Sequence, residues 1–579
     1  MYILGINAYH GDSSAALIRD GKVIVAIEEE RIRRVKHWAG FPSEAIRFCI
    51  SDAGISVEDI DYITIGRDPS AHFVKKMIGS IKRLINPKFV KDRLLNLNKA
   101  MSIKQQVAKS LGNDTKRLRA PLKFVEHHRS HLASAFFSSP FEEAAVISID
   151  GFGDFSSCMF GVGRGNKIEV LDSVTYPHSL GIFYTAFTQF LGFPYYGDEY
   201  KVMGLAPYGE PKYVDLLSDV IRKTDNGKFE LNEKYFLHST KGVAMTWDNC
   251  APFIEMIYSD YLIEKFGKPR DPKEPITDYH KDLAASIQKV CEDIIFHMVN
   301  HLQKKTGLKN LCIAGGVAQN SVANGKIREN SDFVKVYIPP AGYDAGNAIG
   351  SALWLYHQNL NKGNRHFINT SAFGAHFSDE YIEKLLKEKG IKYTRYNNEE
   401  ETIEVTAELL SKGAVLGWFQ GSTEFGPRAL GNRSVLTHPG RKDAKDLINS
   451  KIKRRESFRP FAPSILREYV SEYFEQDDDV YFMEKVFRIR KEKREQIPAV
   501  THVDGTGRLQ TVHKDITPLY YKLIDRFREK TGLPILLNTS FNENEPIVNT
   551  PMEALDCYLR TEMDALVMGN CVILREKKS

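Results

Sequence analysis

Two histidines and an aspartate, close together in the sequence, are the first residues whose types and spacing could do chemistry. His127 and His131 follow the short strand-like run 123–125, and their spacing of four places both imidazoles on one face of a helix. Asp150 follows a second apolar run, 144–149, and in open α/β sheets ligands gather at the carboxyl ends of strands. Such donors could hold a metal ion, although the alternative is that the histidines only cap a helix or pack.

A further acid and a glycine turn extend this candidate site. Asp344 stands at the start of a helix of small residues, and it would complete a set of two nitrogen and two oxygen donors that suits iron(II), manganese or zinc. Gly315 and Gly316 lie between the buried run 311–314 and a helix that begins near Ser321. Glycines at such a turn permit close approach of the backbone to a nucleotide, although an ordinary connection explains them as well.

Basic residues in the last third of the chain could bind an anion. Arg428 lies in a glycine-rich loop after the predicted strand 414–419, and Lys453 and Arg459 follow in a segment where aromatic residues and prolines alternate with charges. Guanidinium groups bind phosphate oxygens in pairs and lysine adds a point charge, so this segment fits a small phosphorylated substrate. Ser540, after another buried run, offers a hydroxyl to phosphate. The alternative is a solvated surface patch.

These residues require an α/β scaffold of more than one domain. A chain of 579 residues exceeds the roughly 100–200 residues of a typical domain. Residues 2–6, 15–18 and 23–27 predict three short strands, and Asp20-Gly21 is a hairpin signal. This opening, with a polar turn between the first two strands, resembles that of the sugar kinase, heat-shock chaperone and actin superfamily.

Composition excludes several other classes of protein. Hydrophobic residues make up 42% and charged residues 26%, which argues against overall disorder. The net charge of +5, from 79 basic and 74 acidic residues, is too balanced to indicate nucleic-acid binding. The seven cysteines form no Cys-x-x-Cys pair, which argues against a zinc ribbon. Without a signal peptide or a run of transmembrane length, we expect a cytoplasmic protein with no nucleic-acid or membrane partner.

Two further segments have a distinctive composition. Residues 71–118 carry Lys75, Lys76, Lys82, Arg83, Lys88, Lys91 and Arg93 at helical spacing. They predict amphipathic helices with a solvated basic face rather than a nucleic-acid or membrane patch. Residues 195–209 contain several glycines and a proline, which predict a shaped loop rather than a regular helix. Its tyrosines and charges suit polar contacts to a hydroxylated ligand.

The order of these motifs resembles the O-carbamoyltransferase family typified by nodulation protein U and tobramycin carbamoyltransferase. The matching segments are 5–13, the His127/His131 pair, 201–209, 314–320, 424–431, 459–464 and 538–542. Together they span nearly the whole chain, and their joint occurrence in this order is far more specific than any one of them.

The resemblance implies a particular fold and domain division. Residues 1–362 would form an α/β domain of the actin and sugar-kinase type, similar to the transferase subunit that makes threonylcarbamoyladenosine in tRNA. Residues 372–579 would form a YrdC-like α/β domain. The polar, asparagine-containing segment 363–371 would be the linker between them.

The resemblance also implies roles for individual residues. The expected metal ligands are His127, His131, Asp150 and Asp344, with iron(II) favoured and manganese or zinc open. The expected carbamoyl phosphate ligands are Arg428, Lys453, Arg459, Arg508 and Ser540. Lys453 and Arg459 would also be catalytic, together with His10, which would touch the acceptor hydroxyl or phosphates. Gly315, Gly316 and Asn320 are expected in the adenosine pocket, with magnesium accompanying ATP.

The implied activity has two steps. Carbamoyl phosphate and ATP would give carbamoyladenylate in the C-terminal domain, and the carbamoyl group would then pass to a hydroxyl of a sugar or natural product at the N-terminal metal site. The alternatives are an ATP-dependent small-molecule kinase on the same N-terminal fold and an inactive nucleotide-binding partner. Hydrogenase-maturation carbamoyltransferases carry Cys-x-x-Cys repeats that this chain lacks. The identity of the acceptor and the formation of a homo-oligomer stay open.

Overall fold

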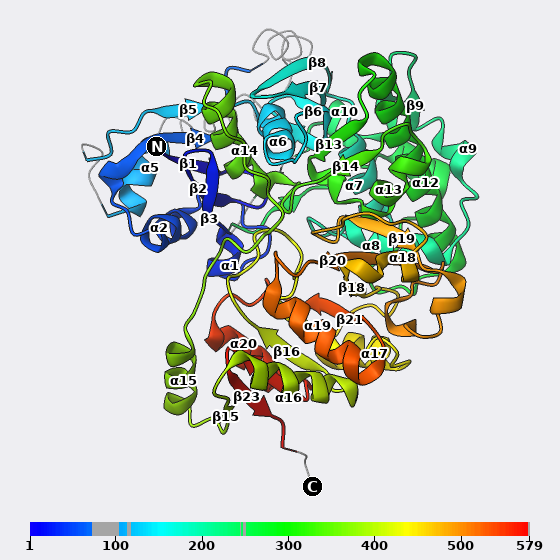
Figure 1. Ribbon diagram of the computed structural model, residues 1–579. Coiled ribbons are helices and arrows are strands. Elements are labelled where there is room, and N and C mark those ends of the chain that lie inside the picture. Colours follow the sequence, from blue (N-terminus) through cyan, green and yellow to red (C-terminus); the bar gives the residue numbers. More distant parts are fainter. Residues whose placement is uncertain (72–102, 113–116, 244, 247–249, 577–579) are drawn as a thin grey trace. The chain divides into compact units, whose positions relative to one another are not determined.

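The computed structural model describes residues 1–71, 103–112, 117–243, 245–246 and 250–576. The chain forms two compact units (Figure 1). The first comprises Met1–Asn320 and Ile327–Ile368, and the second comprises Ser321–Lys326 and Asn369–Ser579. The basic residues predicted on amphipathic helices between 71 and 118 fall within 72–102 and so lie outside the described residues.

The first unit contains two five-stranded sheets with the same topology. Each has three consecutive antiparallel strands followed by two parallel strands on the side of the first. The first sheet has the order β3 (Lys22–Glu28), β2 (Ser14–Arg19), β1 (Tyr2–Asn7), β4 (Ile60–Ile65), β5 (Leu122–Phe124). The second has the order β8 (Lys167–Thr175), β7 (Ser156–Arg164), β6 (Glu143–Gly153), β13 (Asn310–Ala314), β14 (Lys335–Tyr337). This duplication confirms the predicted actin and sugar-kinase type of α/β fold.

Two helices lie between these sheets and position the candidate site (Figure 1). Helix α14 (Asn347–Leu353) packs on β1, β2 and β4, helix α6 (His127–Phe136) packs on β6, β7 and β13, and the two helices contact each other. Their close approach depends on small residues, because a Cβ at Gly350 of α14 would lie 1.9 Å from the carbonyl oxygen of Ser130 in α6. The histidines and the segment after Asp344 therefore face one another across a tight helix pair.

The remaining elements of the first unit are mostly helices. They are α1 (Glu29–Arg33), α2 (Ser43–Asp52), α5 (Ile103–Ser110), α7 (Leu180–Phe190), α8 (Glu199–Leu205), α9 (Val214–Leu217), α10 (Leu237–Thr240), α11 (Asp260–Phe266) and α12 (Asp278–Thr306), with short hairpins β9 (Ile221–Lys223), β10 (Phe229–Leu231) and β11 (Met245–Thr246), β12 (Phe253–Ile254). Helix α8 shows that the prediction of a loop throughout 195–209 was wrong. Val202 and Leu205 are buried, and their packing outweighs the cost of about 1 kcal/mol for Gly204 within a helix.

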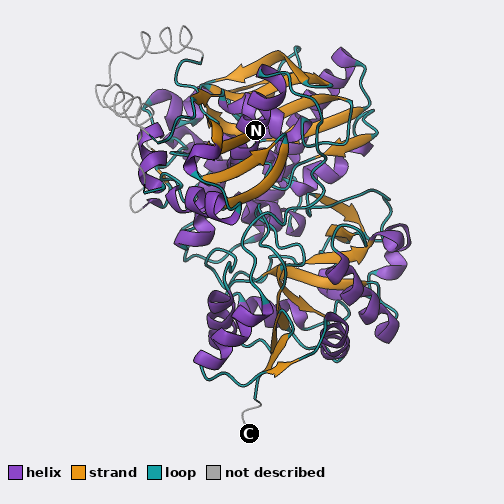
Figure 2. Cartoon of the chain, turned by 60° about the vertical axis from the view of Figure 1, so that its left-hand side comes forward, coloured by secondary structure: helices purple, strands orange, loops and turns teal. Residues whose placement is uncertain are grey.

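The second unit is a nine-stranded mixed sheet with helices beside it (Figure 2). Its order is β15 (Thr394–Arg395), β23 (Cys571–Leu574), β22 (Ala565–Met568), β16 (Leu416–Phe419), β17 (Arg433–Thr437), β21 (Ile535–Ser540), β18 (Ala462–Leu466), β20 (Thr506–Val512), β19 (Lys485–Arg488). The helices are α13 (Ser321–Lys326), α15 (Asp379–Glu388), α16 (Glu399–Ser411), α17 (Ala444–Leu447), α18 (Val470–Tyr473), α19 (Pro518–Thr531) and α20 (Pro551–Arg560).

Alternation along the central strands builds a core on both faces of this sheet. In β16, Leu416 and Trp418 join the cluster formed with α16 and α19, whereas Phe419 joins the cluster formed with α15 and α20. Successive strand residues point to opposite faces, so one apolar run supplies both cores. The second unit is therefore a three-layer α/β structure, which agrees with the predicted fold class.

Candidate active site

A helix follows the short strand, as the sequence predicts; helix α6 begins at His127, and two carboxylates fix its first turn. Glu126 accepts a hydrogen bond from the Arg129 backbone N–H at 2.7 Å, and Asp154 Oδ2 accepts one from the His127 N–H at 3.0 Å. Acidic groups at a helix N-terminus satisfy its unpaired N–H groups. His127 and His131 consequently lie one turn apart on one face of a fixed helix.

Four of the predicted side chains converge in the first unit. His131 Nε2 lies 2.9 Å from Asp150 Oδ2 and 3.1 Å from His127 Nε2. Both Nε2 atoms lie 3.4 Å from Asp344 Oδ1, and His127 Nε2 lies 3.4 Å from Asp150 Oδ2. The histidines and Asp344 are buried, and the Asp150 side chain is 14% exposed. Residues far apart in the sequence thus form one compact cluster of two nitrogen and two oxygen donors.

The geometry of this cluster fits a divalent metal ion. Ligand distances of ~2.0–2.2 Å from an ion at tetrahedral or octahedral angles place neighbouring donors about 2.8–3.6 Å apart, which is the range observed. Asp344 Oδ1 is buried and accepts no hydrogen bond within the described part of the chain. His127, His131, Asp150 and Asp344 can therefore hold a metal ion, and this donor set does not select among iron, manganese and zinc.

Charges within the cluster oppose the effect of burial. Burial would lower the pKa of His127, but the carboxylates of Asp344 and Asp150 raise that pKa well above its ordinary value. Burial would raise the pKa of Asp344, but His10 and His127 hold it well below its ordinary value. Both aspartates are therefore ionised, and a metal ion that binds here would displace the proton from His127.

His10 lies at the rim of this cluster. It belongs to the turn after β1, and its Nδ1 is hydrogen-bonded to Asp344 Oδ2. The His10 and His127 rings lie 5.1 Å apart, and the His10 side chain is 29% exposed. His10 is thus the partly exposed imidazole beside a buried set of donors, where it could meet a substrate.

The glycine turn predicted to meet a nucleotide adjoins the same cluster. Gly315 has a φ of 93°, and a Cβ there would lie 2.2 Å from the carbonyl oxygen of Ile149. A Cβ at Gly316 would lie 2.9 Å from Asp150 Oδ1. Asn320 forms a reciprocal amide pair with Gln288, at 3.0 Å in both directions. The turn is therefore packed against a candidate metal ligand, at the carboxyl ends of β6 and β13.

A second set of ligand-type side chains, which the sequence reasoning missed, lies beyond His10 in the chain. His37 Nδ1 lies 2.7 Å from Asp12 Oδ1, and Glu30 Oε2 accepts the His37 backbone N–H at 2.8 Å. Burial lowers the pKa of His37, but the charges of Asp12 and Glu30 raise it to about 9. This pair is therefore an ion pair at neutral pH rather than a neutral imidazole.

Arginines gather around one buried guanidinium in the second unit. Burial and the charges of Arg428, Arg455 and Arg459 lower the pKa of Arg508. Arg508 Nε finds no hydrogen-bond partner among the described residues. Arg459 Nη1 also lies 3.5 Å from Glu456 Oε2, and this group of four arginines around a buried guanidinium favours an anionic ligand. Three were predicted from the sequence, and Arg455 was not.

Lys453 and Ser540, two further residues predicted to bind phosphate, contact each other in the same unit. Lys453 Nζ donates to the Ser540 carbonyl and hydroxyl oxygens, the latter at 3.1 Å, and to the Asn542 carbonyl and Oδ1 at 2.8 and 2.6 Å. Lys453 is 1% exposed. Its ammonium group is surrounded by protein oxygens, which fixes the loop after β21.

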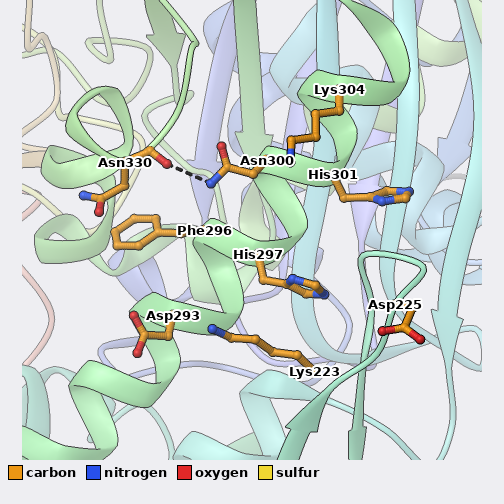
Figure 3. Close-up of a pocket in the computed structure, with 9 residues that line it drawn as sticks. All are labelled: Lys223, Asp225, Asp293, Phe296, His297, Asn300, His301, Lys304 and Asn330. Atoms are coloured by element: carbon orange, nitrogen blue, oxygen red, sulfur yellow. Dashed lines mark hydrogen bonds between the residues drawn. The ribbon is translucent and has the colours of Figure 1, made fainter.

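A separate hollow lies along helix α12 (Figure 3). It is lined by Lys223, Asp225, Asp293, Phe296, His297, Asn300, His301, Lys304 and Asn330. His297 Nε2 lies 2.9 Å from the Thr224 carbonyl oxygen, which ties the β9–β10 hairpin to the helix. Lysines and aspartates alternate around this hollow, and it shares no residue with the metal cluster. Within the described residues, no helix combines the length and apolarity needed to cross a membrane.

Comparison with known proteins agrees with this division into two units. Residues 2–353 match the family described as carbamoyltransferase N-terminus, and residues 407–575 match the carbamoyltransferase C-terminus. An uncharacterised protein of Synechocystis is 41% identical, with 99% of this chain and 97% of the relative covered. Nodulation protein NolNO of Sinorhizobium fredii is 38% identical over 99% of this chain and 80% of the relative. Nodulation protein U of Bradyrhizobium diazoefficiens is 25% identical, covering 94% of this chain and 92% of the relative.

The chain therefore belongs to the carbamoyltransferase family, as its motifs predict, and it is a carbamoyltransferase enzyme.

Proposed function

We propose that this protein is an ATP-dependent O-carbamoyltransferase. Carbamoyl phosphate, ATP and water would be converted to carbamoyladenylate, phosphate and pyrophosphate in the second unit. The carbamoyl group would then be transferred to a hydroxyl of a sugar or natural-product acceptor at the cluster in the first unit, and AMP would leave. The observation that supports this proposal is the gathering of Arg428, Arg455 and Arg459 around the buried Arg508, which would suit a small anionic substrate of a carbamoyltransferase.

The arginines suit the first step because carbamoyl phosphate is a compact anion. Guanidinium groups can bind its phosphate oxygens in pairs, and their charges stabilise the phosphate as it departs. Arg459 and Arg428 come from the segments that sequence reasoning assigned to this role. Lys453 would act through Ser540, because it donates to that hydroxyl and so orients it.

The imidazole and carboxylate cluster suits the second step. A divalent metal ion, with iron(II) favoured by the family likeness, would supply Lewis acidity towards the phosphate of the adenylate. His127, His131, Asp150 and Asp344 would hold it. His10, partly exposed and bonded to Asp344, is placed to bind the acceptor hydroxyl or to take up its proton as the carbamoyl carbon–oxygen bond forms.

The glycine turn would hold the adenosine part of the intermediate. Gly315 and Gly316 expose backbone next to Asp150, so a nucleotide bound there would bring its phosphate towards the metal ligands. The side-chain amide of Asn320 is already oriented by Gln288. ATP would enter the first step with magnesium. In this proposal the two units correspond to residues 1–362 and 372–579, joined by 363–371, and the protein acts in the cytoplasm without nucleic acid or membrane.

One experiment tests the proposed reaction. The purified protein is incubated with ATP, carbamoyl phosphate and a panel of polyols and aminoglycosides, and products are identified by mass spectrometry. A carbamoyl adduct that requires both ATP and carbamoyl phosphate is expected. A phosphorylated acceptor formed without carbamoyl phosphate would instead identify a kinase, and ATP binding without AMP release would identify an inactive partner protein.

A further inference from the structure

The buried side chain of Glu424 is hydrogen-bonded to the backbone of the loop that carries Arg428. Its Oε1 accepts hydrogen bonds from the backbone N–H groups of Leu430 at 2.7 Å, Asn432 at 2.9 Å and Arg433 at 3.3 Å. The residue is 3% exposed. In the sequence, Arg428 lies between Glu424 and the three residues whose N–H groups bind it. The loop that carries Arg428 therefore wraps around the Glu424 side chain.

Arg433 binds backbone carbonyl groups, rather than N–H groups, at the base of the same loop. Its guanidinium group donates to the carbonyl oxygens of Gln420 at 2.6 Å, Gly421 at 3.1 Å and Ala375 at 2.9 Å. The group lies over the Phe419 ring, 3.7 Å from its centroid, and is fully buried. Glu424 thus binds the N–H groups of Leu430 and Asn432 in the loop, and Arg433 binds the carbonyl groups of Gln420 and Gly421.

A buried polar network fixes the other side of the loop. Gln510 Nε2 donates to the Leu430 carbonyl oxygen at 2.8 Å, and Asn538 Nδ2 donates to that of Ala429 at 3.2 Å. Ser464 Oγ donates to Gln510 Oε1 at 2.8 Å. Gln510, Asn538 and Ser464 are each at most 2% exposed. The backbone immediately after Arg428 is therefore held from both sides.

The strands that hold the loop also carry other residues of the arginine site. Arg508 precedes Gln510 by two residues on β20, and Ser540 follows Asn538 by two on β21. Residues two apart on a strand point to the same face. The loop is therefore hydrogen-bonded to the same strands, and on the same face, that carry Arg508 and Ser540. Displacement of the loop would separate Arg428 from Arg508.

We propose that Glu424 is a positioning residue for anion binding. It holds the loop of residues 420–432 in the conformation that presents Arg428 beside Arg508. This inference rests on the proposed function, because it concerns the site assigned to carbamoyl phosphate. Its Oε1 is occupied by three backbone N–H donors, whereas its Oε2 is buried and has no hydrogen-bond partner among the described residues, so Glu424 acts on the loop through Oε1.

The test compares Glu424→Ala and Glu424→Gln with a matched control, Asp564→Asn. Asp564 Oδ2 accepts the Val415 N–H at 2.8 Å, which is also a carboxylate–backbone bond, but at the other end of β16. The Michaelis constants for carbamoyl phosphate and ATP are measured in adenylate formation. Binding of inorganic phosphate is measured by calorimetry. Glu424→Ala is expected to raise the constant for carbamoyl phosphate and weaken phosphate binding at least about tenfold, with the constant for ATP unchanged.

The conservative variant separates positioning from general stability. Glu424→Gln keeps an oxygen that can accept the N–H groups, so it should recover most phosphate binding, and the Asp564→Asn control should bind phosphate like wild type. Equal effects of Glu424→Ala on both substrates, or wild-type phosphate binding by Glu424→Ala, would overturn the inference. If Glu424→Ala does not fold, a loss of phosphate binding in Glu424→Gln without faster amide exchange at Leu430 would overturn it instead. Phosphate binding unaffected by Arg428→Ala would refute the proposed function itself.

Discussion

Substitution of Gly153 by alanine tests the metal cluster through a single methyl group. A Cβ at this position would lie 2.1 Å from Cγ and Cδ2 of His127. Carbon atoms pack favourably only at about 3.5–4.0 Å, so the imidazole would have to retreat by roughly 1.4 Å. Metal–ligand distances tolerate deviations of only about 0.2 Å. We expect metal affinity to fall by at least the ~10–100-fold seen when supporting groups of metal sites are removed.

Gly151 provides the matched control on the same strand. A Cβ at Gly151 meets nothing within 4 Å, so Gly151→Ala should bind metal like wild type. Both variants and wild type are dialysed against iron(II), manganese or zinc, and bound metal is measured by elemental analysis, with thermal unfolding as a check of folding. Full metal content in Gly153→Ala, or equal loss in both variants, would refute the assignment of His127 as a ligand.

Two further predictions concern the second unit. Arg455→Gln should raise the Michaelis constant for carbamoyl phosphate about 10–100-fold without changing that for ATP, because one charge-assisted contact is lost; an unchanged constant would remove Arg455 from the site. Burial raises the pKa of Glu484 to about 7. The native carboxyl therefore keeps its proton at pH values above about 4.5, where the unfolded chain loses it. The free energy of unfolding consequently falls as the pH rises from about 4.5 to about 7. Glu484→Gln should therefore unfold at a higher temperature than wild type at pH 8 but not at pH 4; the same difference at both pH values would contradict this.

Local patterns predicted the elements that frame the first site. The three opening strands and the hairpin at Asp20-Gly21 are present, and both turn residues have positive φ, at 52° and 84°. The strand and helix around His127 are also as predicted. These features depend on apolar runs and turn chemistry over a few residues. The loop predicted throughout 195–209 was wrong, because burial of Leu205 by tertiary packing is invisible to local composition.

The assembly of the sites depends on contacts that the sequence does not encode locally. Asp344 was predicted as the fourth donor, but its contact with His10 across 334 positions was not predicted. Arg455 was missed because a run of basic residues does not reveal which of them turn inward. The neighbouring Arg454 is 58% exposed, whereas Arg455 donates to Asn449 Oδ1 at 2.7 Å.

In the proposed reaction, one chain activates the carbamoyl group at its arginines and transfers it at its imidazole and carboxylate cluster. The most direct measurement supplies each variant either with ATP and carbamoyl phosphate or with synthetic carbamoyladenylate, and follows adenylate formation and acceptor carbamoylation separately. Lys453→Ala or Arg459→Ala should fail to form adenylate but still transfer from supplied carbamoyladenylate. His131→Ala should lose bound metal and form adenylate without transfer. Loss of transfer from supplied adenylate in Arg459→Ala, or unchanged transfer and metal content in His131→Ala, would contradict this proposal.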